Sequence, residues 1–335
     1  MKPVGLIVHA SSGKDIRRLV ASGTVVTNQE KINTIVRMLL AMDAAGVSRV
    51  EIMPDTTGIG RRAISEVEHQ LKRLEVGIIE LPYLTGTAAD TLRTAELMQQ
   101  QAFACAIVMG GDGTCRVASK GLGDTPMVPV STGTNNVFPQ QVEGTLVGLA
   151  VAAFCAHEQV REQCLTYASR LELVDDNGLI DIALVDLVVV SGRDTAARAV
   201  WDPALIRELF LLYTQPDSLG LSSIGAWLTP LVSGDSDQGM HIRTGAGKHK
   251  IQAPIAPGLI CELPIANCQS FGVGDSIALQ GNNIVIALDG EREVTLSAHK
   301  NTRVRITDNG PRVVNIKNAL YTAAQSGFQL APSQS

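Results

Sequence analysis

The residues with the clearest chemical potential in this 335-residue chain are Gly-Gly-Asp-Gly-Thr at positions 110–114. They follow the apolar segment Cys105–Met109, which predicts a buried parallel strand. A glycine turn after such a strand presents backbone N–H groups at the carboxyl edge of a sheet, where they can approach phosphate oxygens. A lone carboxylate, Asp112, would lie at this anion site, which is unfavourable unless it binds a metal or transfers a proton. The turn therefore predicts a nucleotide site with a catalytic acid or base.

Two further polar turns follow predicted strands. Ser131–Asn136 offers hydroxyl and amide donors for phosphate or ribose oxygens, and it would face the same sheet edge as the first turn. Ser11–Lys14 comes after the opening strand, and Lys14 supplies a point charge. It is not a Walker A motif, because the spacing is different and Asp15 replaces the Ser or Thr that would hold Mg²⁺. Each turn alone is also typical of an ordinary loop, so their convergence carries the prediction.

A later turn, Asp289-Gly290-Glu291, ends an apolar segment with two carboxylates. By itself the pattern is typical of a hairpin with a solvated glutamate. If the second half of the chain folds back over the first site, these acids would be placed to bind Mg²⁺ or to accept a hydroxyl proton.

An alternative motif, Gly58–Ala63, fits G-x-G-x-x-A, and Glu80 lies near the spacing expected for a dinucleotide-dependent oxidoreductase. The segment Pro54–Thr57 separates the preceding strand from the first glycine, whereas the fingerprint needs that glycine at the strand end. We therefore treat this motif as the weaker interpretation.

The elements that must position these turns change character along the chain. Up to about residue 142, predicted strands alternate with helices, one of which begins with a capping box at Thr27 and Glu30. The predicted strands of this part are Val4–His9, Val50–Met53, Val76–Leu81, Cys105–Met109 and Met127–Val130. The pattern predicts an α/β N-terminal domain with a parallel sheet and helices on both faces.

The later segments predict an antiparallel β-sandwich-like C-terminal domain. Its expected strands are Leu179–Val190, Gly258–Leu263, Ser276–Gln280, Asn283–Leu288, Val294–Ala298 and Arg303–Thr307. Asp202-Pro203 predicts a helix start, and Val313–Gln325 a final helix. We place the α/β nucleotide-binding domain at 1–142, the β-rich domain at 143–312, and the C-terminal helix and frayed tail at 313–335.

Composition limits the partners. The net charge of −5 and an aromatic content of 4% argue against nucleic acid and against an anionic membrane surface. The six cysteines form no C-x-x-C pair, and no segment resembles a signal peptide or a membrane span. We expect a cytoplasmic protein with reduced thiols that forms a homo-oligomer and binds small-molecule nucleotides.

The order of Gly-Gly-Asp-Gly-Thr, a P-x-x-x-G-T-N-N loop beginning at Pro129, and a β-rich half ending in Asp-Gly-Glu resembles the NAD kinase–diacylglycerol kinase superfamily. The segments Ser12–Val20 and Asn28–Lys31 resemble more specifically the ATP-NAD kinase-like family that includes acetoin catabolism protein X. The resemblance spans nearly the whole chain. It implies an α/β nucleotide domain followed by a β-sandwich, with the active site between them.

The resemblance also implies roles for individual residues. Asp112 would face the acceptor hydroxyl as the base, and Glu291 would be the second candidate base. From the two acids of the later turn itself, we expect Asp289 to be a metal ligand. The residues expected to bind the nucleotide are Ser12, Gly13, Lys14, Gly110, Gly111, Gly113, Thr114, Gly133, Thr134, Asn135 and Asn136. The chain departs from NAD kinases at Asn135-Asn136, where NAD kinases carry Asn-Glu in a substrate motif. The motifs that would bind the phosphate donor therefore match the family better than those that would bind the phosphate acceptor.

These observations predict an ATP-dependent phosphotransferase that uses Mg²⁺ and acts on a hydroxyl, with NAD as the acceptor. Two alternatives stay open. One is a lipid or small-alcohol kinase of the diacylglycerol kinase type, against which the lack of a basic amphipathic helix counts. The other is a non-catalytic nucleotide-binding regulatory protein.

Overall fold

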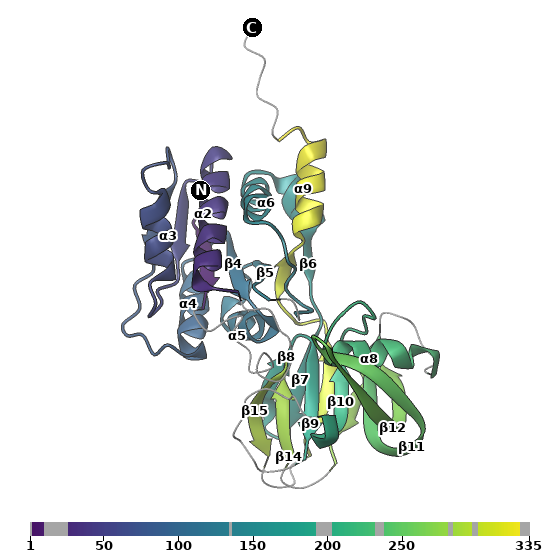
Figure 1. Cartoon of the computed structure of the whole chain (residues 1–335). Coiled ribbons are helices and arrows are strands. Elements are labelled where there is room, and N and C mark those ends of the chain that lie inside the picture. Colours follow the sequence, from purple (N-terminus) through teal and green to yellow (C-terminus); the bar gives the residue numbers. More distant parts are fainter. Residues whose placement is uncertain are drawn as a thin grey trace.

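The computed structural model describes residues 2–9, 26–133, 136–191, 203–231, 238–280, 284–296 and 301–328. Figure 1 shows an α/β domain in the upper half of the view and a β domain below it, with β6, β17 and their neighbouring segments running between the two. This arrangement confirms the predicted fold class.

The sheet of the α/β domain has the strand order β3-β2-β1-β4-β5-β17-β6. Its neighbours pair in parallel from β3 to β17, and β6 pairs antiparallel with β17. The chain passes through β1 to β5 with a helix between most strands, which is why the pairing is parallel. The strands are β1 Val4–Val8, β2 Arg49–Ile52, β3 Glu75–Ile78, β4 Cys105–Gly110, β5 Met127–Ser131, β6 Leu165–Tyr167 and β17 Arg312–Val314.

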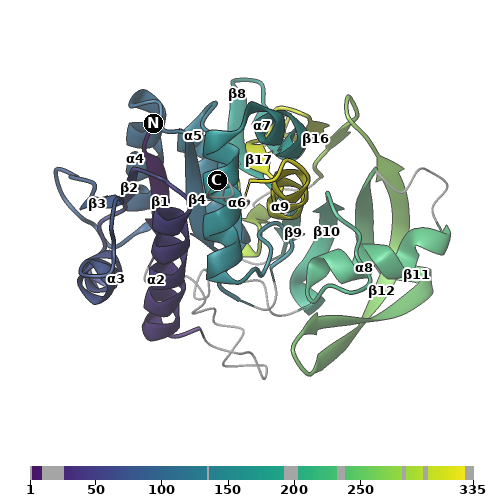
Figure 2. The ribbon, with the colours of Figure 1, turned by 90° about the horizontal axis from the view of Figure 1, so that it is seen from above.

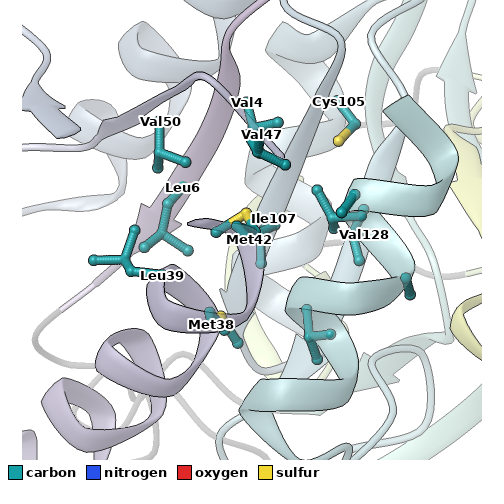
Figure 3. Packing of buried hydrophobic residues seen from close by; sticks show 14 of the residues in the cluster. Val4, Leu6, Met38, Leu39, Met42, Val47, Val50, Cys105, Ile107 and Val128 are labelled. Carbon is teal, nitrogen blue, oxygen red and sulfur yellow. The ribbon is translucent and has the colours of Figure 1, made fainter. Parts of the chain in front are cut away.

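Helices cover both faces of this sheet. One face packs against α2 (Asn28–Ala44), α3 (Ile59–Val67), α6 (Gly144–Ala156), α7 (Glu158–Cys164) and α9 (Ile316–Gln325). The other face packs against α4 (Ala88–Gln100) and α5 (Asp112–Leu122). The predicted capping box is present at the start of α2, where Thr27 and Glu30 exchange hydrogen bonds. Figure 3 shows Met38, Leu39 and Met42 of α2 packed near Leu6 of β1 and Ile107 of β4.

The first core extends beyond the predicted boundary at residue 142. α6 contributes Val147, Val151 and Phe154 to the same core as β1 and β4, and α9 contributes Ala319. Figure 2 shows α6 and α9 lying beside each other, and both helices pack on the same face of this sheet. The segments 144–167 and 312–325 therefore complete the α/β domain, although both lie outside the range that the sequence assigned to it.

The β domain consists of two sheets that face one another. The larger has the order β12-β11-β10-β9-β14-β15 and the smaller β13-β16-β7-β8. Leu173 and Val304 of the smaller sheet pack against Val189, Phe210 and Ile286 of the larger. The strands are β7 Arg170–Asp175, β8 Gly178–Ala183, β9 Asp186–Val190, β10 Ile206–Leu211, β11 Gly239–Ala256, β12 Leu259–Phe271, β13 Ser276–Ala278, β14 Ile284–Leu288, β15 Glu291–Leu296 and β16 Arg303–Thr307. The outer face of the larger sheet packs against α8 (Leu221–Leu228).

The structure corrects three sequence predictions. The stretch 179–190 is not one strand, because the chain leaves one sheet after β8 and enters the other at β9. Pro203–Leu205 forms only a short 3₁₀ turn before β10. The predicted helix at 313–325 begins with strand β17, and α9 starts at Ile316. In each case tertiary pairing outweighs local propensity.

The short link between β8 and β9 also joins the two domains. Leu184 is fully buried, and it packs in the core formed by α4, α5 and the adjacent strands. A β-domain side chain therefore completes the core on the α5 side of the parallel sheet. No helix within the described residues is long and apolar enough to cross a membrane.

Close packing between α2 and α6 depends on Gly148. A Cβ atom at this position would lie 2.6 Å from the Met38 carbonyl oxygen and 2.7 Å from the Ala41 Cβ. We expect Gly148→Val to lower the free energy of unfolding by about 2 kcal/mol through overpacking. Leu146→Ala, on the exposed side of the same helix, should change it much less. Urea denaturation measures both, and equal effects would contradict the packing argument.

Candidate nucleotide site

The two glycine turns meet at one edge of the sheet, as the sequence predicted. β4 and β5 are parallel neighbours, and Gly110 at the end of β4 pairs with Ser131 at the end of β5. The Thr132 amide donates to the Gly110 carbonyl at 3.2 Å. The strand ends are therefore held in register where open α/β sheets bind ligands.

Glycine is required in the first turn because neighbouring side chains approach its backbone. A Cβ at Gly110 would lie 2.4 Å from the Thr114 Cβ, and a Cβ at Gly111 would lie 2.9 Å from Asn136 Oδ1. Asn136 Nδ2 also donates to Ser131 Oγ at 2.7 Å. Asn136 thus links the turn after β4 to the turn after β5.

Asp112 is the first residue of α5 and is half-buried. Its Oδ1 accepts hydrogen bonds from the Phe138 amide at 2.8 Å and the Val137 amide at 3.1 Å. These amides and the amino end of the helix both stabilise negative charge at this position. Gly111, the N-cap residue of α5, has no side-chain oxygen that could accept a hydrogen bond from the backbone of the first turn. Gly113 and Thr114 lie in that turn. The negative charge of Asp112 is therefore stabilised at the amino end of a helix, where anions also bind.

The Asp-Gly-Glu turn is a two-residue hairpin between β14 and β15. Leu288 pairs with Glu291, and both central residues have positive φ, 50° at Asp289 and 80° at Gly290, as a type I′ turn requires. The Asp289 carboxylate accepts hydrogen bonds from the amides of Leu184, Val185 and Asp186, at 2.8 to 3.2 Å. Asp289 therefore holds the link between β8 and β9, a role that sequence reasoning missed.

Asp289 also reaches α5. Its Oδ2 lies 3.4 Å from Arg116 Nε, and both side chains are fully buried. On the same helix Lys120 forms a 2.5 Å ion pair with Asp181 of β8, and Arg116 lies 3.7 Å from Asp181. Burial raises the pKa of Asp289, while Arg116 and the amide donors oppose that rise. Arg116 is one helical turn after Asp112, so the ion pair brings the Asp-Gly-Glu turn against the helix that follows the glycine turn.

Two further residues lie within electrostatic reach of both acids. Burial and the carboxylates of Asp289 and Asp112 raise the pKa of Tyr213, which follows β10. Burial, Asp112 and Asp289 likewise raise the pKa of the Cys115 thiol. Both groups therefore stay protonated at neutral pH, and Tyr213 offers a hydroxyl donor near the acids. The sequence around Tyr213 has no motif that could have indicated it.

The positions of several other predicted site residues stay untested. Ser12, Gly13, Lys14, Thr134 and Asn135 lie outside the described residues. Glu291 begins β15, but its side chain lies outside the description. Within the described part of the chain, no group of three or more His, Cys, Asp or Glu side chains is arranged to hold a metal ion. The four contacts of Asp289 favour a structural role, and its assignment as a metal ligand stays a prediction.

The alternative glycine motif has a structural explanation. Gly58 has a φ of 70° and caps α3, and five residues separate it from the end of β2 at Ile52. A Cβ on Gly60 would lie 2.9 Å from Ile52 Cγ2, so Gly60 allows α3 to pack closely on the sheet. These glycines follow the strand too late for the dinucleotide fingerprint.

Comparisons with known proteins match both halves of the chain. Residues 4–146 match the ATP-NAD kinase N-terminal domain, and residues 169–309 match the acetoin catabolism protein X C-terminal domain. Acetoin catabolism protein X from Cupriavidus necator is 34% identical to this chain over an alignment of 335 positions, which covers 96% of this chain and 92% of that protein.

A parallel α/β domain that carries the Gly-Gly-Asp-Gly-Thr turn and is followed by an antiparallel β domain defines the NAD kinase-like class of proteins. The kinase-like fold is thus shared over both domains. Within that class, the chain belongs to the acetoin catabolism protein X family.

The buried ion pair between the domains gives a stability prediction. We expect Arg116→Met to lower the free energy of unfolding by about 3 kcal/mol, because Asp289 would be left buried without its cation. The double variant Arg116→Met/Asp289→Asn should lose less than the sum of the single variants, since neither residue then carries a charge. Lys120→Met, at a more exposed ion pair, should lose less than about 1 kcal/mol. Additive effects in the urea-denaturation cycle would contradict this coupling.

Proposed function

We propose that this protein is an ATP-dependent phosphotransferase with a hydroxyl acceptor, and that the acceptor is the adenosine ribose of NAD. The observation that carries the proposal is the amino end of α5, where Asp112 stands beside a glycine cap without a side-chain oxygen. The match to the ATP-NAD kinase N-terminal domain supports both nucleotides. The relative's name refers to acetoin catabolism, and we extend that metabolic context to this chain.

The described residues fit a phosphate group at this edge. Gly110 is buried at the end of β4, Gly111 is half-buried, and Gly113 and Thr114 lie in the first turn of α5. Backbone N–H groups at a helix start bind phosphate oxygens without a positive side chain. Asn136 and Ser131, which hydrogen-bond each other, supply neutral polar groups beside this turn for the nucleotide. Ser12, Gly13, Lys14, Thr134 and Asn135 would extend the same site.

The proposed chemistry needs little beyond positioning and charge stabilisation. The acceptor hydroxyl oxygen forms a bond to the γ-phosphorus of ATP, the bond from that phosphorus to the bridging oxygen breaks, and ADP leaves. Asp112 takes the hydroxyl proton. Glu291 is the second candidate base. Mg²⁺ bound to the ATP phosphates would neutralise their charge, and the protein would need to contribute only one or two carboxylates to hold it.

One observation favours a second candidate function. The Asp112 carboxylate accepts hydrogen bonds from two backbone amides, so it also orders the segment at Val137 and Phe138. An acid in that position can maintain a binding site without transferring a proton. A non-catalytic protein that binds ATP or NAD and regulates a partner is therefore the alternative.

The catalytic assignment predicts the effect of a single substitution. Asp112→Asn keeps an oxygen that can accept from the Phe138 amide but lowers basicity, so NADP formation from NAD and MgATP should fall at least about 100-fold. Thermal unfolding should stay close to that of the unmodified protein. The matched variant Asp176→Asn, in the exposed turn between β7 and β8, should keep full turnover. Unchanged turnover in Asp112→Asn would remove Asp112 from the mechanism.

Binding and turnover measured together distinguish the candidate functions. ATP at about 100 times its Kd should stabilise the protein by about 2.7 kcal/mol, with NADP formed when NAD and Mg²⁺ are present. Gly111→Ala should lose this stabilisation, because its Cβ would enter the turn 2.9 Å from Asn136 Oδ1. Gly272→Ala, whose Cβ would make only ordinary contacts at 3.8 Å, should keep it. Product with dispersed diacylglycerol instead of NAD would favour a lipid kinase, and stabilisation without any product would favour the regulatory protein.

A further inference from the structure

Three cysteines gather at the edge of the parallel sheet opposite the glycine turns. Cys105 is the first residue of β4, Cys155 lies in the last turn of α6, and Cys164 ends α7. The Cys105 and Cys155 side chains hydrogen-bond each other, and Cys164 lies within electrostatic reach of Cys105. Gly110, at the other end of β4, is five residues away, about 16 Å along a strand. This thiol group is therefore separate from the candidate nucleotide site.

A cavity gives access to one of the paired thiols. It has a volume of about 830 Å³, and its lining includes Cys155, Phe103, Pro126 and Arg161. Cys155 is half-buried, whereas Cys105 is fully buried. A small molecule in the cavity can therefore reach Cys155 first, and Cys105 only through it.

The surroundings shift the pKa values of the Cys155 and Cys105 thiols in opposite directions. The Arg161 guanidinium donates to the Cys155 carbonyl at 3.0 Å, which holds its positive charge near the thiol. The hydrogen bond from Cys105 and the charge of Arg161 lower the pKa of Cys155, although burial opposes this. The same hydrogen bond, together with burial, raises the pKa of Cys105 well above its ordinary value. Cys155 lines the cavity, and Cys105 is fully buried beside it, which is the arrangement of an attacking and a resolving cysteine.

We propose that Cys155 is an oxidation site for small hydroperoxides and that Cys105 resolves it as a disulfide. The Cys155 thiolate attacks one peroxide oxygen, the O–O bond breaks, and the departing oxygen takes a proton to leave as water or an alcohol. The Cys105 sulfur then attacks the sulfenic acid at Cys155, the S–O bond breaks, and water leaves with the Cys105 proton. Two thiols are oxidised by two electrons, and one hydroperoxide is reduced.

The pairing places a covalent link between the start of β4 and the end of α6. β4 is the strand whose other end carries Gly110, and α6 packs on the same sheet through Val147 and Val151. The link requires no exposure of the buried thiol, because the two side chains are already hydrogen-bonded. Cys164 is a weaker partner, because burial raises its pKa to about 11, and its electrostatic effect acts on Cys105.

Treatment of the full-length protein with one to two equivalents of hydrogen peroxide tests the proposal. The intact mass should fall by about 2 Da, and peptide mapping should show Cys105 joined to Cys155. Cys155→Ser should abolish the mass change. Cys105→Ser should instead leave a sulfenic acid at Cys155 that dimedone traps. Should Cys105→Ser fail to fold, brief peroxide treatment of the unmodified protein with dimedone present should still label Cys155 in preference to the other cysteines.

Cys268 provides a matched control. It is half-buried on β12, away from the three cysteines, and burial raises its pKa. Cys268→Ser should form the Cys105–Cys155 disulfide to the same extent as the unmodified protein. An unchanged mass, a disulfide that maps to a different pair, or oxygen addition at Cys155 without a disulfide would each overturn the proposal.

Discussion

The arrangement of the two domains depends on the buried ion pair between Arg116 and Asp289. Both side chains are fully enclosed, and each would be strongly destabilising without the other. Asp289 also accepts hydrogen bonds from three consecutive amides between β8 and β9. These amides donate to Oδ1, whereas Arg116 faces Oδ2, so both oxygens of the carboxylate have partners. A buried charge is tolerated under this condition. One carboxylate therefore connects α5, the hairpin between β14 and β15, and the link between the two sheets of the β domain.

This connection explains why α5 holds a central position. Its first turn contains Asp112 and meets the segment at Val137 and Phe138 through hydrogen bonds. Its next two turns contain Arg116 and Lys120, which pair with acids of the β domain. The opposite, apolar side of α5 shares a core with Leu184. The helix that follows the candidate phosphate-binding turn is thus the same helix on which the second domain is mounted, so the site and the domain interface cannot vary independently.

The sequence predicts the parts of this fold that depend on local pattern. Apolar runs and glycine turns located β4 and β5, and the convergence of their ends followed from the geometry of parallel sheets. Sequence reasoning missed what depends on distant partners. The run from Leu179 to Val190 contains no glycine or proline, and the link at Leu184 is held by Asp289, more than a hundred residues later, which accepts hydrogen bonds from the amides of Leu184 and Val185. Tyr213 was missed for the same reason, since its neighbours Asp112 and Asp289 are distant in the sequence.

The structure also separates the roles of the acids in the two turns. Asp289 was predicted to bind a metal from its position beside Glu291, yet its oxygens face Arg116 and the amides of Leu184 to Asp186. A carboxylate with these donors positions the turn, and the positive φ at Asp289 and Gly290 fixes the direction in which β15 begins. Asp112 differs because it is half-buried and stands at a helix start whose cap lacks a side-chain oxygen. Of these two aspartates, Asp112 is therefore the less buried, and it is the one to which the proposed function gives the role of base.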